Sequence, residues 1–230
     1  MSLSKKTREY KSSIVGELHE YNILLETKEI FLHGYIGDTE DDPGIDYRSA
    51  SNFIKNIKIL ESMDDKPIIV HQYSVGGSWE CGMMMFDIIN NSNLFIIFIL
   101  HGVAASMGSI IPQAADLRVI MPNCCFMVHS GYTGINSELT MKQSRSWIEW
   151  ERHITDSTFN IYAEKCQNGL FFTEKQSTIS DVKKYIKKQL DEREDWFLGS
   201  CEAVNLGFAD GIYGQSGFED INIIRKLCEK

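Results

Sequence analysis

Two apolar runs, each followed by a turn of small residues, constrain the fold of this chain most. The first run covers residues 67–73 and ends at the turn SVGGS, after which residues 79–90 have helical periodicity. The second run covers residues 94–100 and is followed by HGVAASMGS at 101–109. Because strands that alternate with helices need crossover connections, this order predicts an α/β fold with a largely parallel sheet.

The remaining patterns extend this alternation along the chain. Ala50, Phe53, Ile54 and Ile57 have the spacing of an amphipathic helix, and the segment 126–129 is typical of a short strand. The other predicted elements are a strand at 29–32, an acidic loop at 37–44, a long helix from Ser137 to about Glu164, a loop at 166–180, a helix at 181–193 with Ser180 as its N-cap, and a turn, a short helix and a terminal strand within 195–213.

The size and charge of the chain bound its class. With 230 residues, 43% of them hydrophobic, the chain can bury one sizeable core. We therefore expect a polar arm at 1–18 followed by a single domain at 19–230. A formal net charge of -9 argues against nucleic acid or an anionic membrane surface as the partner.

Because neither a membrane-length apolar run nor a secretory signal is found, and because of the cysteine spacing, we expect a cytoplasmic protein without a bound metal. The longest apolar run is far too short to span a membrane. The polar start MSLSKKTREYKSS lacks the apolar core of a secretory signal. The six cysteines form no C-x-x-C pair, so we expect reduced, buried thiols rather than a zinc site or a disulfide scaffold.

Residues suited to catalysis lie where the predicted strands end. Ser106 sits among small residues after the second apolar run, and His129 follows a short strand. The glycine pair Gly76-Gly77 and the helix start at Met107 offer backbone N–H groups that can point at a common centre. Hydrolysis of an acyl bond requires a nucleophile, a base and such donors, so the residues by themselves indicate a serine hydrolase.

The residues by themselves leave the base and its orienting acid open. His71 and His101 also lie at strand ends, so periodicity does not single out His129 among the six histidines. Several carboxylates are available to orient the base: Asp181, Asp191, Glu192, Glu194, Asp195 and Asp210.

Five motifs in a fixed order resemble ClpP, the proteolytic subunit of the Clp protease. They are EYNILLETKEIFLHG, the glycine pair of SVGGS, GVAASMGS, MPNCCFMVH and DWFLGSCEAVNLGFAD. The stretch GVAASMGS is similar to the G-x-A-A-S-M-G motif around the nucleophile of that family. MPNCCFMVH is similar to the family segment that ends at the catalytic histidine.

The resemblance assigns roles by position. It implies that Ser106 is the nucleophile, His129 the general base and Asp195 the acid that orients the histidine. It also implies that the backbone N–H groups of Gly77 and Met107 form the oxyanion hole.

The resemblance further implies an architecture and partners. The family fold is a ClpP/crotonase-like stack of ββα units with a protruding helical handle, here at about 137–190. Family members assemble as two stacked heptameric rings and degrade polypeptides delivered by a ring-shaped ATPase of the ClpX or ClpA kind. ATP is used by that ATPase, so we expect no cofactor on this chain.

Departures from the family pattern leave alternatives to this function. Val75 replaces a proline, Ser130 and Gly131 replace glutamine and proline, and the handle is longer through 166–180. These changes affect the substrate groove and the contact between rings. The alternatives are a phage head-maturation protease that acts without an ATPase, a non-catalytic ring scaffold, and an acyl-CoA enzyme of the crotonase type.

Overall fold

The computed structural model describes residues 14–16, 18–34, 44–131 and 138–229. The predicted arm at 1–18 and the acidic loop at 37–44 lie mostly outside these residues. The elements are β1 (Ile23–Leu24), β2 (Glu29–Gly34), α2 (Tyr47–Glu61), β3 (Ile68–Ser74), α3 (Trp79–Asn90), β4 (Ile96–Ala105), α4 (Met107–Ile110), η1 (Ile111–Ala114), β5 (Leu117–Ile120), β6 (Cys125–Val128), α5 (Met141–Cys166), α6 (Leu170–Thr173), α7 (Ile179–Arg193), β7 (Trp196–Leu198), α8 (Ser200–Asn205), β8 (Gly211–Ile212), α9 (Ile221–Lys226) and η2 (Leu227–Glu229).

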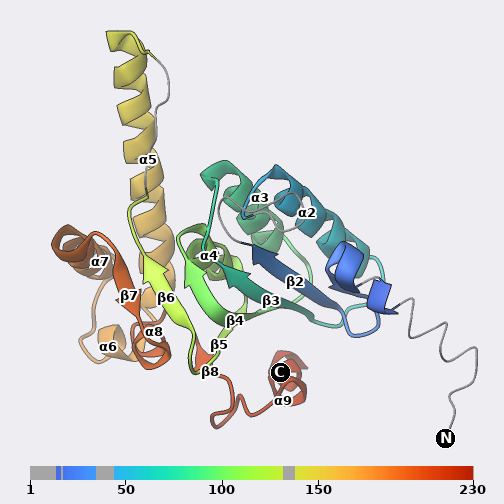
Figure 1. Cartoon of the computed structure of the whole chain (residues 1–230). Helices are drawn as coiled ribbons and strands as arrows, with labels where there is room; N and C mark the ends of the chain where they lie inside the picture. The colour runs from blue at the N-terminus through green and yellow to red at the C-terminus, as the bar shows by residue number, and fades with distance from the viewer. Residues whose placement is uncertain (1–13, 17, 35–43, 132–137, 230) are drawn as a thin grey trace, which may run out of the picture.

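The main sheet has the strand order β1-β2-β3-β4-β5-β8 (Figure 1). All neighbours from β2 to β8 in this order are parallel, and β1 joins the edge antiparallel to β2. The predicted α/β fold with a largely parallel sheet is therefore confirmed. α2 and α3 are the crossover helices that connect β2, β3 and β4.

The two crossover helices form because their first turns are capped and one face of each is apolar. Asp46 makes a reciprocal capping box with Ser49 at the start of α2, and Ser78 caps α3 by accepting from the Cys81 N–H. The predicted inward face of α2 is buried at Phe53, which is 2% exposed. Each helix thus packs against the strands that the two apolar runs provide.

The central strand β4 pairs with different strands along its two halves. Its residues 97–100 pair with β5, whereas its residues 103–105 pair with β6. The strand predicted at 94–100 therefore continues to Ala105, because its last residues find a partner in β6. β7 then pairs antiparallel with β6. This second group of strands carries the candidate site.

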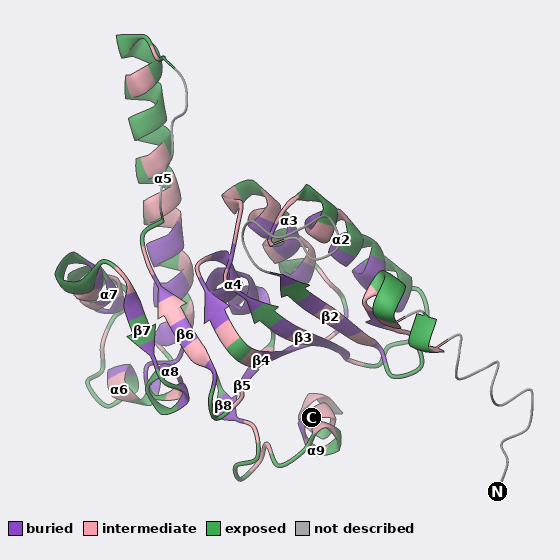
Figure 2. Ribbon diagram, viewed as in Figure 1, coloured by how far each residue is buried: buried purple, intermediate pink, exposed green. Residues whose placement is uncertain are grey.

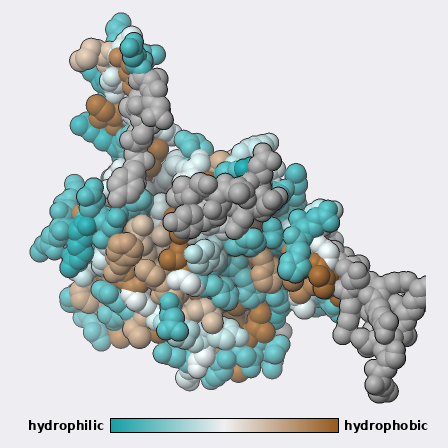
Figure 3. Space-filling view, viewed as in Figure 1, coloured by the Kyte–Doolittle hydropathy of each residue, from teal (hydrophilic) through white to brown (hydrophobic). Residues whose placement is uncertain are grey.

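The long helix α5 projects from the body of the molecule (Figure 1). Its buried residues all lie in its second half, from Thr158 to Cys166, and its first half is largely exposed (Figure 2). α7 packs beside it, with Lys183 Nζ 2.6 Å from Asp156 Oδ1. Space-filling spheres show apolar side chains among polar ones along the projecting part (Figure 3), where Met141 and Ile148 are exposed.

Three details of this handle region differ from the sequence prediction. The helix begins at Met141, where Thr140 forms a capping box with Gln143, rather than at Ser137, which lies outside the described residues. The predicted loop at 166–180 contains the short helix α6. The N-cap of α7 is Thr178 rather than Ser180. The Thr178 side chain accepts from the Asp181 N–H, and the Asp181 side chain accepts from the Thr178 N–H.

The C-terminal helix α9 covers part of the sheet face that lies opposite α2 and α3. No sequence pattern indicated this packing. Arg225 of α9 lies 2.8 Å from Glu29 of β2, and Glu29 lies 3.0 Å from Nε2 of His71. Ile224 of α9 is fully buried in an apolar cluster separate from the main core, together with Ile69, Ile97, Ile99 and Val119.

The charge of Glu29 is maintained at neutral pH. Burial tends to raise the pKa of Glu29, but contacts from His71, Thr27 and Arg225 outweigh burial and hold that pKa below its ordinary value. The stabilisation by this carboxylate is present above its ordinary pKa. It is lost as the pH falls through the lowered value, so the contact with α9 persists at neutral pH.

Replacing Arg225 with methionine is expected to loosen α9 while the main core stays folded. The change removes the charge that contacts Glu29, and a hydrogen bond to a charged group contributes about 1.5 kcal/mol or more. Amide hydrogen exchange in α9 should therefore accelerate about tenfold. Lys226→Met, at the neighbouring exposed position, should leave this exchange unchanged. Equal exchange in the two variants would show that the ion pair does not hold the helix.

Candidate active site

Ser106 occupies the sharp turn between β4 and α4. Its backbone has φ 54° and ψ -127°, a conformation that costs a residue with a side chain about 1–3 kcal/mol. Backbone hydrogen bonds hold the turn: the Ser106 N–H donates to the Met127 carbonyl, and the Ser109 and Ile110 N–H groups donate to the Ser106 carbonyl. The surrounding chain thus fixes the strained serine and directs its side chain away from the strand.

A buried hydrogen-bond chain connects this turn to the handle. The Ser109 hydroxyl donates to the Ser106 carbonyl at 2.7 Å, and its Oγ lies 2.7 Å from the hydroxyl of Tyr162 in α5. Since the single hydroxyl proton of Ser109 goes to Ser106, Tyr162 is the donor in the second bond. Burial raises the pKa of Tyr162, so its hydroxyl keeps that proton.

His129 lies beside Ser106 because of strand pairing. β6 runs parallel to the end of β4 with Met127 opposite Ala105, so the residues that follow both strands emerge together. Nε2 of His129 is 2.7 Å from Oγ of Ser106. The serine and histidine predicted from the sequence are therefore within hydrogen-bonding distance, as a nucleophile and its general base must be.

Asp195 lies on the other side of His129. β7 pairs antiparallel with β6, with Trp196 opposite Val128, so Asp195 is set opposite His129. Its Oδ1 is 3.6 Å from Nδ1 of His129. This is an ion-pair distance, longer than a hydrogen bond, and catalytic contacts without substrate are often long in this way.

Two of the other candidate acids and both alternative histidines contact groups away from Ser106. Asp210 contacts the buried guanidinium of Arg118, and Asp181 contacts Thr178 at the start of α7. His71 and His101 contact each other at 3.1 Å, in the group that also includes Glu29. Among the candidate acids, Asp195 is the one for which the structure gives an ion-pair distance to His129.

The glycine pair approaches Ser106 closely, as the sequence predicted. Gly76 has φ 103°, and a Cβ atom built on it would lie 2.7 Å from the Cβ of Ser106 and 3.0 Å from the Met107 nitrogen. Gly77 has φ 155° and forms a parallel bridge with Ile45. Gly76 therefore makes the close approach to Ser106, while Gly77 lines the same pocket as Ser106 and Met107.

Comparison with known proteins identifies the family of this chain. The model of the Clp protease family matches residues 16–216. The chain belongs to the Clp protease family. It is accordingly a serine-type peptidase.

Two curated Clp proteases illustrate the relationship. The chain is 34% identical over 217 residues to "ATP-dependent Clp protease proteolytic subunit 2" of Pseudomonas aeruginosa, covering 92% of this chain and 94% of that protein. It is 26% identical over 195 residues to the "ATP-dependent Clp protease proteolytic subunit" of Ligilactobacillus salivarius, covering 84% and 86%.

A solved structure supports the fold of this Clp protease. A mutant ClpP1 from Listeria monocytogenes superposes with a TM-score of 0.66 at 20% identity, covering 87% of this chain and 96% of that chain. The ClpP/crotonase-like architecture with its handle is therefore confirmed. Within the described part of the Clp protease chain, no helix is both long and apolar enough to cross a membrane. The same residues contain no group of at least 3 histidine, cysteine or acidic side chains placed to hold a metal.

A cleft of about 360 Å³ opens beside Ser106 in this Clp protease. One wall is the face of α5 that carries Trp147, Trp150, Glu151 and Ile154, and the opposite wall is the start of α3, with Glu80. Glu80 and Glu151 were not among the site residues predicted from the sequence. The available signal was the spacing of the α5 residues, which places them on one helical face.

The pKa of His129 in the Clp protease site lies below its ordinary value. Burial disfavours the imidazolium, although the charge of Asp195 acts in the opposite direction. A general base must be unprotonated, so a lowered pKa suits the role of base that is predicted for His129.

The acidic limb of kcat/KM against pH should therefore have an apparent pKa below 6.5. Asp195→Asn should lower that apparent pKa further, because the charge that raises the pKa of His129 is removed. The neighbouring exposed Asp191→Asn should not change it. An acidic limb above 6.5 in the wild-type enzyme would contradict the assigned effect of burial.

Proposed function

We propose that this chain is a serine endopeptidase that cleaves polypeptides with Ser106, His129 and Asp195. The observation that carries the proposal is the 2.7 Å distance from Ser106 Oγ to His129 Nε2 at a strained turn between strand and helix. Membership of the Clp protease family supports the same reading.

The proposed reaction proceeds in two halves. Ser106 Oγ attacks the carbonyl carbon of the scissile bond while Nε2 of His129 takes the hydroxyl proton, and Asp195 stabilises the resulting imidazolium. The N–H groups of Gly77 and Met107 donate to the oxyanion. His129 then gives its proton to the departing amine, which leaves an acyl group on Ser106. Water, activated by His129, hydrolyses that ester.

We further propose assembly into two stacked heptameric rings that enclose the site in the cytoplasm. The projecting half of α5 supports this, since Met141 and Ile148 expose apolar surface that a second copy can cover. The P. aeruginosa relative is described as ATP-dependent. We therefore propose a ClpX- or ClpA-like ATPase as partner, which would use the ATP, with no cofactor on this chain.

A fluorophosphonate probe tests the proposed nucleophile. Mass mapping should find one probe group on Ser106, and short fluorogenic peptides should be cleaved by the same preparation. Light scattering after size exclusion should report the mass of the assembly. Absence of both labelling and cleavage in the assembled protein would refute the proposed activity.

The role of the ATPase is tested separately. An unfolded protein should be degraded only when a ClpX-like ATPase and ATP are added. Trimming of a capsid or scaffold protein without any ATPase would instead favour the head-maturation alternative.

A further inference from the structure

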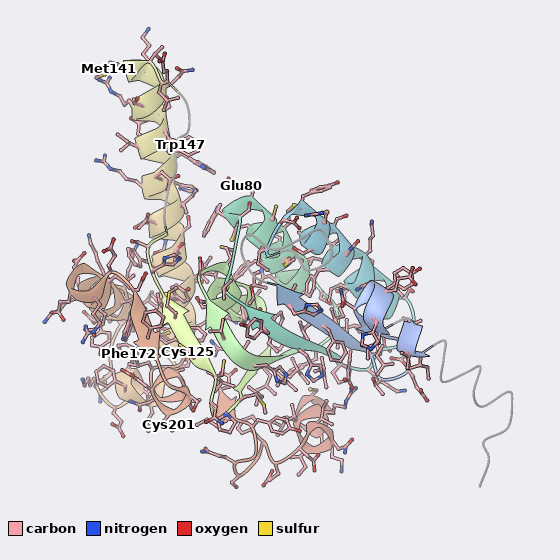
Figure 4. The ribbon with its side chains drawn as sticks, in the orientation of Figure 1. Glu80, Cys125, Met141, Trp147, Phe172 and Cys201 are labelled. Atoms are coloured by element: carbon pink, nitrogen blue, oxygen red, sulfur yellow. The ribbon has the colours of Figure 1, made fainter. Side chains whose placement is uncertain are left out.

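The cleft beside Ser106 is lined by aromatic and aliphatic side chains together with two carboxylates. It lies between α5 and the first turn of α3, and Ser106 and His129 form its floor. Figure 4 shows Trp147 on the side of α5 nearest the start of α3, where Glu80 lies. A side chain next to the bond that Ser106 attacks would enter this space.

Two carboxylates line the cleft from opposite walls. Glu151 is half-buried on α5, and Glu80 is exposed at the start of α3, where the Ser78 hydroxyl donates to it at 3.0 Å. Among the described lining residues there is no lysine or arginine. The cleft is therefore negatively charged on both sides of the space that a substrate side chain would occupy.

The charge of Glu151 is not matched by an ion pair among the described residues. Glu151 also borders a neighbouring hollow that contains Arg152, Lys183 and Lys187. However, Lys183 contacts Asp156 and Asn160 instead. Among the described residues, no lysine or arginine nitrogen forms a salt bridge with Glu151 within 4.0 Å. Glu80 is partly compensated by its place in the first turn of α3. Glu151 is thus the stronger attraction for a cation.

Indole rings add a second attraction for positive charge. Trp147 and Trp150 are 40% and 45% exposed and lie one turn apart on the same face of α5. An ammonium or guanidinium group over an indole face gains about 0.5–1 kcal/mol at an exposed site. Ile154, deeper on that face, offers an apolar contact for the aliphatic stem of a lysine or arginine.

We propose that this cleft selects substrates with lysine or arginine immediately before the scissile bond. The inference rests on the proposed peptidase function and adds its substrate class. An acidic side chain would be repelled by Glu80 and Glu151. An aliphatic side chain would displace water from the Glu151 carboxylate and offer that carboxylate no hydrogen bond or ion pair in return, which costs free energy.

A set of four fluorogenic peptides tests the inference. They differ only before the scissile bond, where they carry lysine, arginine, leucine or glutamate. In the wild-type enzyme, kcat/KM for lysine and arginine should exceed that for leucine by about tenfold, the combined effect of one ion pair and one cation–π contact. Glutamate should be the poorest. The ratio of lysine to leucine should fall in 1 M salt, where charges are screened within about 3 Å.

Variants locate the source of the preference. Glu151→Gln should lower the ratio of lysine to leucine about fivefold, and Glu80→Gln about twofold. Glu149→Gln, at an exposed position of α5 outside the cleft, should leave the ratio unchanged. Fluorophosphonate labelling of Ser106 is measured in parallel for every variant.

The outcomes separate the inference from the function on which it rests. If Ser106 is labelled and leucine is preferred, or if Glu151→Gln leaves the ratio unchanged, the inference is wrong and the peptidase function stands. If the wild-type enzyme is neither labelled nor active on any of the peptides, the proposed function fails and the inference fails with it.

Discussion

Ser106→Ala is expected to reduce kcat/KM for a peptide substrate by roughly 10⁴ to 10⁶-fold. The change removes the oxygen that lies 2.7 Å from His129 Nε2 and leaves no other group in its place. The remaining donors can still bind a substrate carbonyl, so a small residual rate above that of water is expected. The fold should be retained, because the backbone hydrogen bonds of the turn do not use Oγ of Ser106.

The matched control is Ser216→Ala, which changes an exposed serine in a distant turn and should leave kcat/KM unchanged. Steady-state kinetics and mass-mapped labelling are the measurements. If the two variants have equal rates and equal labelling, Ser106 is not the nucleophile.

Gly76→Ala is expected to lower kcat/KM by about 10³-fold, the second largest effect. A Cβ at this position would lie 2.7 Å from Cβ of Ser106 and 3.0 Å from the nitrogen of Met107, so the nucleophile and an oxyanion donor would both be displaced. The positive φ of 103° adds backbone strain. Both effects act on the reacting groups themselves.

Gly199→Ala provides a control for the added methyl group. Gly199 has φ -78°, and a Cβ there would meet nothing within 4 Å. Its activity and melting temperature should remain close to those of the wild-type enzyme. A Gly76→Ala enzyme with normal kcat/KM would show that the glycine loop does not set the geometry of the site.

Ser106 and His129 could be named as candidates from the sequence because both follow apolar strands that are easy to identify. The choice of His129 over His71 and His101 required the family resemblance. The choice of Asp195 required the family resemblance, since five other carboxylates were available. The structure supplies the physical reason, which is the antiparallel register of β6 and β7 that sets Asp195 opposite His129. Strands as short as these contain too few residues for their register to be deduced from periodicity.

The parts that the sequence did not predict depend on packing between distant segments. α9 has only six residues, so its stability comes from contacts with the sheet rather than from its own helical propensity. The spacing of Trp147 and Glu151 is that of one helical face, but it does not indicate that this face borders Ser106. That arrangement depends on how α5 leaves the body of the molecule.

The hydrogen bonds from Tyr162 through Ser109 to the Ser106 carbonyl connect α5 directly to the turn that holds Ser106. A ligand on Ser106 that prefers one position of this turn also prefers the corresponding position of α5. Because such linkage is reciprocal, a contact made along the handle must change affinity at Ser106 by the same factor by which occupancy of Ser106 changes that contact. In the stacked rings proposed above, substrate occupancy and subunit association would therefore depend on each other through this connection.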